Sequence, residues 1–364
     1  MSGRLFFIPL LFLSTFVWAQ SGGNNTYEFL NLPAGSRIAA LGGNNVSHYD
    51  DDLNFVLNNP GLLRPELNEK VVLNFINYLS DINFGYVSYA KNFDKIGMFA
   101  AGMQYINYGN FIHADETGEI LGDFVPAEYS FNIAYSLPVS DKFTAGTNLK
   151  FIYSDFWSYF SSGMAFDAGV SYIDTAKLLS AGLVIKNIGL QLKPYTPGFR
   201  EPLPYDVQIG VTKKLAHAPL RFSVTAQDLL RWNLDYVSVF NNSYELNTSI
   251  ADTTFRQKFA TAMNKVGQAG DELIRHILIG AEIVPHPNFY IALGYNYRRR
   301  TELSLQTAPK LVGMSIGFGL KLTKFNLNYS LASYHVAGAS HHFSVGLNLA
   351  AFYKKSDYVI QNIP

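Results

Sequence analysis

The stretch that decides the fold is residues 129–153, YSFNIAYSLPVSDKFTAGTNLKFIY. Apolar side chains occupy every second position from Tyr129 to Leu137, with small polar or alanine side chains between them. The second half repeats this alternation after a short turn at 138–141. A period of two is typical of β-strands, and each arm has roughly the ten residues that a tilted strand needs to cross a bilayer. The stretch therefore predicts two antiparallel strands long enough to span a membrane.

The two faces of these predicted strands differ in size as well as in polarity. One face carries many aromatic side chains, and the other carries mainly Ser, Asn, Gly and Thr. A soluble β-sandwich would turn its bulky face inward, whereas a membrane barrel turns its bulky face to lipid and its polar face to the lumen. This stretch alone does not distinguish a soluble β-sandwich from a membrane barrel, so the rest of the chain is needed for that decision.

The composition of the 364-residue chain excludes several classes of protein. Apolar residues make up 48% and aromatic residues 15%, but charged residues only 15%, against about 25% in a typical soluble domain. No internal segment approaches the roughly 18 apolar residues of a membrane helix, so a membrane protein here must be a barrel. The net charge is zero, which argues against a nucleic-acid partner. The absence of cysteine excludes disulfides and thiolate metal sites.

Residues 1–19 have the pattern of a signal peptide. Arg4 supplies the positive charge, residues 5–18 form the apolar core, and Ala19 is a small residue suited to cleavage. An anchor helix is the alternative, but the apolar core is short for one. We therefore expect the mature protein to leave the cytoplasm.

Residues 20–67 differ from everything that follows them. Strand-like alternation is poor, Gly, Asn and Asp are dense, and several prolines interrupt the segment. Helical turns are expected at 36–41 and 51–57, the second capped by Asp50 or Asp51. A plug, or hatch, folded inside a barrel lumen fits this pattern. The run Asp50, Asp51, Asp52 lacks the ligand spacing of a calcium loop and is better explained as a capping or solvated cluster.

From residue 71 onward the chain is predicted to form about fourteen strands, an even number, as in bacterial outer-membrane barrels. The predicted barrel domain is 68–350, and 351–364 is a predicted periplasmic tail. The expected strands are 71–78, 83–91, 95–106, 127–137, 142–153, 162–173, 178–187, 204–213, 220–229, 274–284, 288–298, 310–320, 324–334 and 341–350.

The connections between these strands are sorted by length. Those after even-numbered strands are all short, such as 138–141, whereas those after odd-numbered strands are mostly long, with only 79–82 as an exception. Short periplasmic turns and long outer loops are typical of outer-membrane barrels, and a soluble β-protein has no reason to sort them. The predicted long outer connections are 107–126, 154–161, 188–203, 230–273 and 299–309. The fold class predicted is therefore all-β, a transmembrane outer-membrane barrel with an N-terminal plug.

The longest connection, 230–273, contains a candidate helix. Apolar residues recur at three- and four-residue spacing within 254–273, as in an amphipathic helix. It could be a lid on its own barrel or a docking face for a partner, and the sequence does not favour either.

Several charged residues fall on the polar faces of predicted strands and should point into the lumen. They could select a permeant, but ion pairs with one another and with charged plug residues are the favoured interpretation. The strand residues are Lys150, Asp167, Lys186 and Glu282, and the plug residues are Arg37, Asp50, Asp51 and Asp52.

Sequence signatures of catalysis are missing. The letters G-x-S-x-G occur only at 313–317 (GMSIG), within a predicted strand and not at the strand-to-helix turn of a nucleophile elbow, and there is no H-E-x-x-H motif. His113 and Asp115 could share a metal ion, but one such pair is weak evidence. We expect no enzyme activity, no cofactor and no metal.

Several segments of the chain resemble PorV- and PorQ-type proteins of the type IX secretion system of Bacteroidetes. The N-terminal ones are TYEFLNLP (26–33), SRIAALGG (36–43) and LNNPGLL (57–63). Four later ones resemble the PorQ-type members more closely: ADETGEILG (114–122), VIKNIGLQLKPY (184–195), KKLAHAP (213–219) and GYNYRRR (294–300). Gly61 stands where an alanine is commoner after Asn-Pro, a mild departure.

The resemblance implies a fourteen-stranded barrel of the long-chain fatty-acid transporter type. It also implies an anchoring role in an attachment complex, beside a PorZ-like surface protein, a PorU-like sortase and a PorV-like shuttle, at the lipid and lipopolysaccharide of the outer membrane. Aromatic side chains of the long loops would be the candidate partner contacts: Tyr108, Phe111, Phe124, Trp232, Tyr236 and Phe240.

The alternative function is a transporter or channel for hydrophobic small molecules such as fatty acids, because fold does not determine function. Such a transporter needs an apolar pocket or a lateral opening. The inward-facing residues predicted here are mostly Ser, Asn, Gly and Thr, which weakens that alternative without excluding it.

Overall fold

A computed structural model describes residues 25–78, 80–232, 234, 270–303, 311–335 and 338–353. The predicted signal peptide, Tyr236, Phe240, most of the candidate helix at 254–273 and the tail beyond 353 lie outside these residues. No helix among the described residues is both long enough and apolar enough to cross a membrane.

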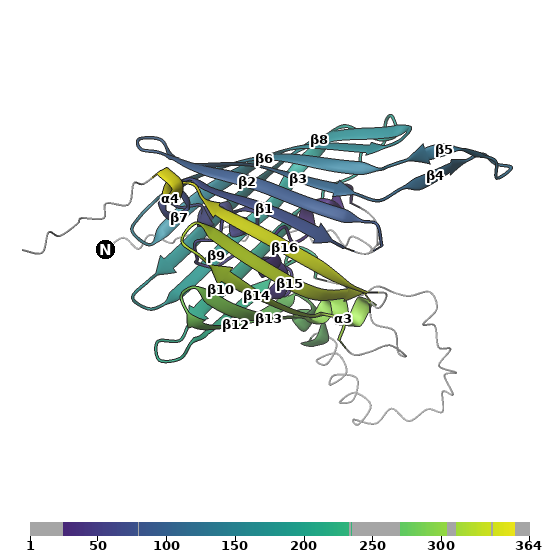
Figure 1. The fold of residues 1–364 in the computed structure, drawn as a ribbon. Coiled ribbons are helices and arrows are strands. Elements are labelled where there is room, and N and C mark those ends of the chain that lie inside the picture. Colours follow the sequence, from purple (N-terminus) through teal and green to yellow (C-terminus); the bar gives the residue numbers. More distant parts are fainter. Residues whose placement is uncertain are drawn as a thin grey trace, which may run out of the picture.

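The described chain forms a closed barrel of fourteen antiparallel strands (Figure 1), which confirms the predicted fold class. The first and last strands close it, with Leu73 opposite Val345. The barrel strands are β1 (Lys70–Asn77), β2 (Asn83–Phe93), β3 (Gly97–Asn107), β6 (Ala127–Pro138), β7 (Phe143–Phe156), β8 (Tyr159–Asp174), β9 (Leu179–Lys193), β10 (Asp206–Lys214), β11 (Leu220–Ala226), β12 (Ile277–His286), β13 (Phe289–Asn296), β14 (Met314–Lys321), β15 (Phe325–His335) and β16 (Gly338–Asn348).

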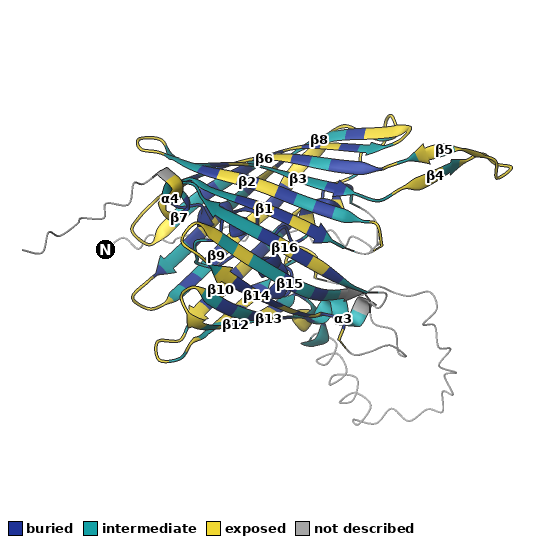
Figure 2. Ribbon diagram, in the orientation of Figure 1, coloured by how far each residue is buried: buried dark blue, intermediate teal, exposed yellow. Residues whose placement is uncertain are grey.

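The bulky apolar face of the strands points outward. On β6, Phe131 is 51% exposed and Ile133 48%, whereas Ser130 is fully buried and Asn132 nearly so. Figure 2 shows the same alternation as bands of buried and exposed residues along the strands. Polar side chains thus face the interior and apolar ones face outward, as in barrels that lipid surrounds.

The sorting of connections by length is less strict than predicted. The expected loop 154–161 is wrong, because β7 and β8 continue through it and leave only residues 157–158 as a turn. Ser154 and Ser161 pair across the two strands and are buried, so the small inward side chains continue beyond the predicted strand ends. Trp157 takes a positive φ of 64° at the tight turn. The β15–β16 connection, 336–337, is also short.

The predicted loop 107–126 contains a β-hairpin of its own. Its strands, β4 (Phe111–Ala114) and β5 (Ile120–Phe124), form a separate two-stranded sheet that projects beyond the barrel (Figure 1). Asp115 closes the turn, since its carboxylate accepts hydrogen bonds from the backbone N–H groups of Thr117 and Glu119. Sequence reasoning missed this hairpin because each strand is too short to show clear alternation.

Residues 25–67, called the lumen segment below, lie inside the barrel. The segment holds four 3₁₀ turns and one helix, α1 (Ser36–Ala40), and contacts the wall on several sides. Helix α1 lies against β13 to β16, turn η2 (Leu53–Leu57) against β1 and β2, and turn η3 (Pro60–Leu62) against β6 to β8. The remaining turns are η1 (Glu28–Asn31) and η4 (Pro65–Leu67). Asp52, and not Asp50 or Asp51, caps η2, because its side chain accepts from Asn54 N at 3.0 Å.

Small wall residues allow the backbone of the lumen segment to approach the strands. A Cβ atom on Gly182 would collide with the carbonyl of Val46, and one on Gly294 with the backbone at Gly42. The same arrangement recurs at Gly146, where a Cβ would meet the carbonyl of Pro60, whereas at Gly169 and Gly317 it would meet the side chains of Asn59 and Ala40. The inner face of the wall therefore fits the backbone of the lumen segment closely.

Inward serines satisfy carbonyl groups that this close approach removes from water. Ser171 donates to Gly61 O at 2.6 Å, and Ser315 donates to Ala40 O at 2.9 Å. Ser180 similarly donates to Ser47 O at 2.6 Å. Buried backbone groups need such partners, so the Ser-rich inner face has a structural role in holding the lumen segment.

We expect Gly294→Ala to destabilise the folded barrel by about 1–3 kcal/mol, the usual cost of overpacking. The added Cβ would displace the backbone of the lumen segment at 40–42. Gly85→Ala is the matched control, since its Cβ would have only an ordinary 3.6 Å contact with Asn74 O. Urea unfolding in detergent, followed by the gel mobility of folded barrel, measures the difference. Equal midpoints for the two variants would contradict the close fit.

Candidate functional site

A buried ion pair joins the lumen segment to the barrel wall. Arg37, on α1, donates from Nε to Glu282 Oε1 on β12 at 2.7 Å, and the two side chains are only 2% and 1% exposed. Arg37 also lies 2.9 Å from Asp50 and stacks its guanidinium on the ring of Tyr290, 4.0 Å from the ring centroid. The structure thus brings together the predicted lumen residues Arg37, Asp50 and Glu282.

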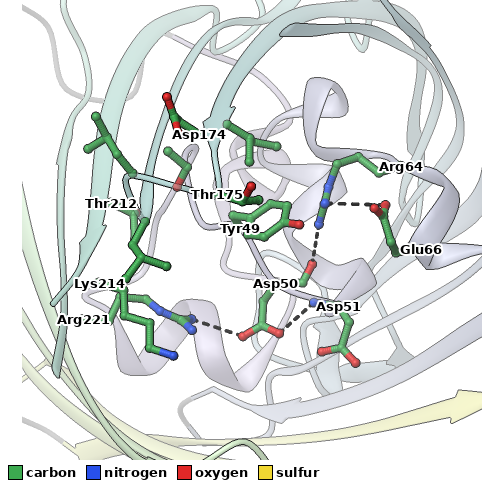
Figure 3. Close-up of a pocket in the computed structure, with 14 residues that line it drawn as sticks. Tyr49, Asp50, Asp51, Arg64, Glu66, Asp174, Thr175, Thr212, Lys214 and Arg221 are labelled. Atoms are coloured by element: carbon green, nitrogen blue, oxygen red, sulfur yellow. Dashed lines mark hydrogen bonds and ion pairs between the residues drawn. The ribbon is translucent and has the colours of Figure 1, made fainter. Parts of the chain in front are cut away.

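Further wall cations complete this cluster. Arg221, on β11, lies 3.1 Å from both Asp50 and Glu282, and Figure 3 shows it directed at Asp50. Lys321, at the end of β14, pairs with Asp50 at 2.5 Å and also with Asp51. Lys70, at the start of β1, also lies 3.2 Å from Asp51, so four cations face three carboxylates. A buried charge is tolerated only when it is paired and hydrogen-bonded, and every carboxylate of this cluster has at least two cationic partners.

His48 lies in the same cluster as a neutral base. Its Nε2 is 2.8 Å from an Arg221 nitrogen, which can only donate, so Nε2 accepts. The imidazole stacks on Phe55, with ring centroids 4.4 Å apart. Burial lowers the pKa of His48 to about 4, so the ring stays uncharged at neutral pH.

A second buried pair stabilises an irregularity in the wall. Lys150 and Asp167 are fully buried and lie 2.7 Å apart. Asp167 also accepts a hydrogen bond from the backbone N of Asn187 at 2.7 Å, and Asn187 accepts one from Lys150 at the same distance. The β8–β9 register shifts between Phe166 and Ala168, and Asn187 has φ of 57°. The Lys150–Asp167 ion pair therefore lies at a β-bulge between β8 and β9.

The other two predicted lumen residues are placed differently. Asp52 caps a turn and makes no ion pair with a described residue. Lys186 lies beside Asp206 in the β9–β10 ladder, yet it joins neither of the two ion-pair groups.

The predicted partner contacts fall in two places. Tyr108 is half-buried and donates to Glu128, whereas Phe111 and Phe124 face each other across the projecting hairpin, with ring centroids 5.7 Å apart. Trp232 is exposed and stacks on His276. Sequence reasoning missed Trp157, which packs on Phe124 with ring centroids 5.4 Å apart. Its position at the turn between two long strands was the available signal.

Cavities lie at both ends of the barrel. One, of about 400 Å³, is at the short-turn end beside Tyr49, Asp50 and Arg64 (Figure 3). Another, of about 290 Å³, is at the long-loop end. Between them the lumen segment is packed, and Leu41 and Phe55 are almost fully buried. The middle of the described lumen is therefore filled.

The described residues offer little for catalysis. They contain no group of three or more His, Asp or Glu side chains arranged to hold a metal ion. Ser340 Oγ lies 2.9 Å from His342 Nε2, but both side chains are completely buried. This pair has no exposed surface at which a substrate could react.

No protein-family model matches the chain, and no curated protein matches it. Among solved structures, the Pseudomonas putida toluene transporter TodX is similar at a TM-score of 0.50 and 10% identity, covering 87% of this chain and 99% of TodX. A Pseudomonas aeruginosa FadL homologue is similar at a TM-score of 0.46 and 10% identity, covering 86% and 98% of the two chains. At such identity the likeness to TodX shows the fold alone, a closed antiparallel β-barrel.

Glu282→Gln should destabilise the barrel by about 3 kcal/mol, the lower end for breaking a buried ion pair, because it removes the carboxylate that Arg37 and Arg221 share and leaves Asp50 as their remaining acidic partner. Lys91→Met is the control, since Lys91 and Glu69 form a partly exposed pair on the wall, and such pairs contribute little. The unfolding midpoint in urea distinguishes the two variants. A loss no greater for Glu282→Gln than for Lys91→Met would show that the cluster is not important for stability.

Acid should weaken the barrel partly through His48. Its folded pKa of about 4 is below the usual value of about 6.5, so the unfolded chain binds the proton first. The stabilisation is complete above the unfolded pKa and is lost as pH falls through 6.5 toward 4. We therefore expect a steeper loss of unfolding free energy in the wild type than in His48→Gln over this range. Parallel curves would show that His48 does not contribute.

Proposed function

We propose that the chain is a non-enzymatic outer-membrane barrel that anchors a protein partner at the cell surface, as a component of a type IX secretion attachment complex. The observation that carries the proposal is a contrast within one molecule. The middle of the lumen is filled and held by buried ion pairs, whereas an apolar hairpin projects beyond the barrel wall.

The hairpin supports this proposal by the chemistry of its surface. Ile112 and Ile120 are 64% and 66% exposed, and Phe111 and Leu121 are also exposed. The hairpin strands β4 and β5 that carry them project beyond the barrel (Figure 1), where lipid does not account for their exposure. Contiguous exposed apolar residues commonly mark interaction sites, and aromatic anchors often dominate their energetics.

The identity of the partners rests on the sequence resemblance. That resemblance points to a PorZ-like surface protein held next to a PorU-like sortase and a PorV-like shuttle, at the lipid and lipopolysaccharide of the outer membrane. An anchor of this kind needs a stable barrel and an exposed contact surface. It needs no chemistry of its own, and the described residues offer none that a substrate could reach.

The second candidate is a transporter or channel for hydrophobic small molecules. The comparisons favour this candidate over attachment, since a toluene transporter has the same fold. Transport would require the lumen segment to move, because its packed residues separate the two cavities. The buried ion pairs described above oppose that movement, which is why we place this function second.

Changing Ile112 and Ile120 together to Ser should abolish co-purification of a large surface protein from native outer membranes in mild detergent. The barrel itself should remain folded, because both side chains lie on the projecting hairpin. Ile96→Ser is the control, as it changes a similarly exposed apolar residue in a turn at the opposite end. Retention of the partner by the double variant would exclude the hairpin as the anchor.

The same purification tests the second candidate. Wild-type barrel recovered without a protein partner, but with extractable fatty acid in its lumen, would support transport and oppose anchoring. Uptake of labelled fatty acid by cells that make the wild-type barrel, but not by cells that lack it, would support transport in the same way.

A further inference from the structure

The cavity at the long-loop end is a polar pocket formed by the lumen segment and the wall. Its volume of about 290 Å³ is near the lower end of the range for small-molecule sites. It is lined by Asn31, Asn44 and Asn58 of the lumen segment and by wall residues that include Lys186, Asp206 and Gln208. This pocket belongs to neither of the ion-pair groups described above.

Lys186 gives the pocket a buried cation without a close partner. Its side chain lines the cavity and is only 5% exposed, yet it makes no hydrogen bond or ion pair with any described residue. Lys150, on the neighbouring wall, shows the ordinary solution, with Asp167 at 2.7 Å and Asn187 at the same distance. A buried ammonium usually has such partners, because desolvation is costly.

Asp206 lines the same pocket with a carboxylate. It is the β-ladder neighbour of Lys186, but the two side chains do not form an ion pair. Its Oδ2 accepts from Gln208 at 2.6 Å, whereas Oδ1 is fully enclosed by protein atoms. The pocket wall therefore holds a cation and a carboxylate that do not pair with each other.

Other lining groups are already oriented by one another. Asn44 donates to Gln208 at 2.9 Å and to Gln227 at 3.2 Å. Arg298 pairs with Asp228 at 2.7 Å. Polar groups held in place in this way can orient a ligand without a further cost of ordering them.

We propose that this pocket binds a small hydrophilic carboxylate that carries a hydrogen-bond donor at its other end, the chemistry of an amino acid or a hydroxy acid. The ligand carboxylate accepts from Lys186, and the ligand ammonium or hydroxyl donates to the carboxylate of Asp206, which also lines the cavity. Lys186 thereby gains the close partner that it lacks. The cavity surface is mainly polar, so the proposed ligand is hydrophilic and the proposal is independent of both functions considered above.

The test is isothermal titration of purified full-length barrel in detergent with L-alanine, L-lactate, propionate and alaninamide. Alanine and lactate should bind, propionate should bind more weakly because it lacks the donor, and alaninamide should not bind because it lacks the carboxylate. Lys186→Met should weaken alanine binding about tenfold or more, as loss of a buried charged partner does. Lys213→Met, which removes an exposed lysine at the other end of β10, should change nothing.

Asp206→Asn separates the two halves of the proposed contact. It should weaken alanine and lactate binding but leave propionate binding unchanged. Gel mobility of the heated and unheated barrel checks that each variant is folded, and Lys186→Gln replaces Lys186→Met if the latter does not fold. Binding of alanine to the wild type and the Lys186 variant with equal affinity would overturn the proposal. So would an absence of heat with every ligand, which would mean that water alone fills the pocket.

Discussion

The contact on which most of the interior depends is the ion pair between Arg37 and Glu282. It links a five-residue helix of the lumen segment to strand β12, in a place where water cannot solvate either charge. Such a pair contributes little by itself, since its Coulombic attraction is offset by desolvation. Its importance is in specificity, because displacing the lumen segment would leave Arg37 and Glu282 each without the other as a partner.

The rest of the inner wall is consistent with that requirement. Glycines leave room for the backbone of the lumen segment, serines satisfy its carbonyl groups, and Arg221 and Lys321 neutralise the remaining carboxylates. A wall built to conduct would instead line an open path. The described wall is matched to one particular occupant, which is part of the same chain. The packing of the interior does not explain why the projecting hairpin exposes apolar side chains.

Much of the fold could be predicted because apolar and polar residues alternate with a period of two along each single strand. Residues 129–153 showed the two faces, and the charges on the polar face were expected to point inward. The pairing of these charges could not be predicted, because Arg37, one partner of Glu282, comes from a helix 245 residues earlier. Asp52 became the cap because Asp50 and Asp51 are engaged by wall cations. The isolation of Lys186 depends on side-chain directions at a β-bulge, which alternation does not reveal.

The closure of the barrel also constrains the order of events in folding. Ser36 donates its backbone N–H to Ser344 at 2.8 Å, a contact between residues 308 positions apart. Helix α1 lies against β13 to β16, the last strands of the chain. Contacts of such high sequence separation form late and slowly. The lumen segment is synthesised before β13 to β16 but can dock only after them, so Arg37 and Asp50 keep their hydration until the wall that replaces it is complete.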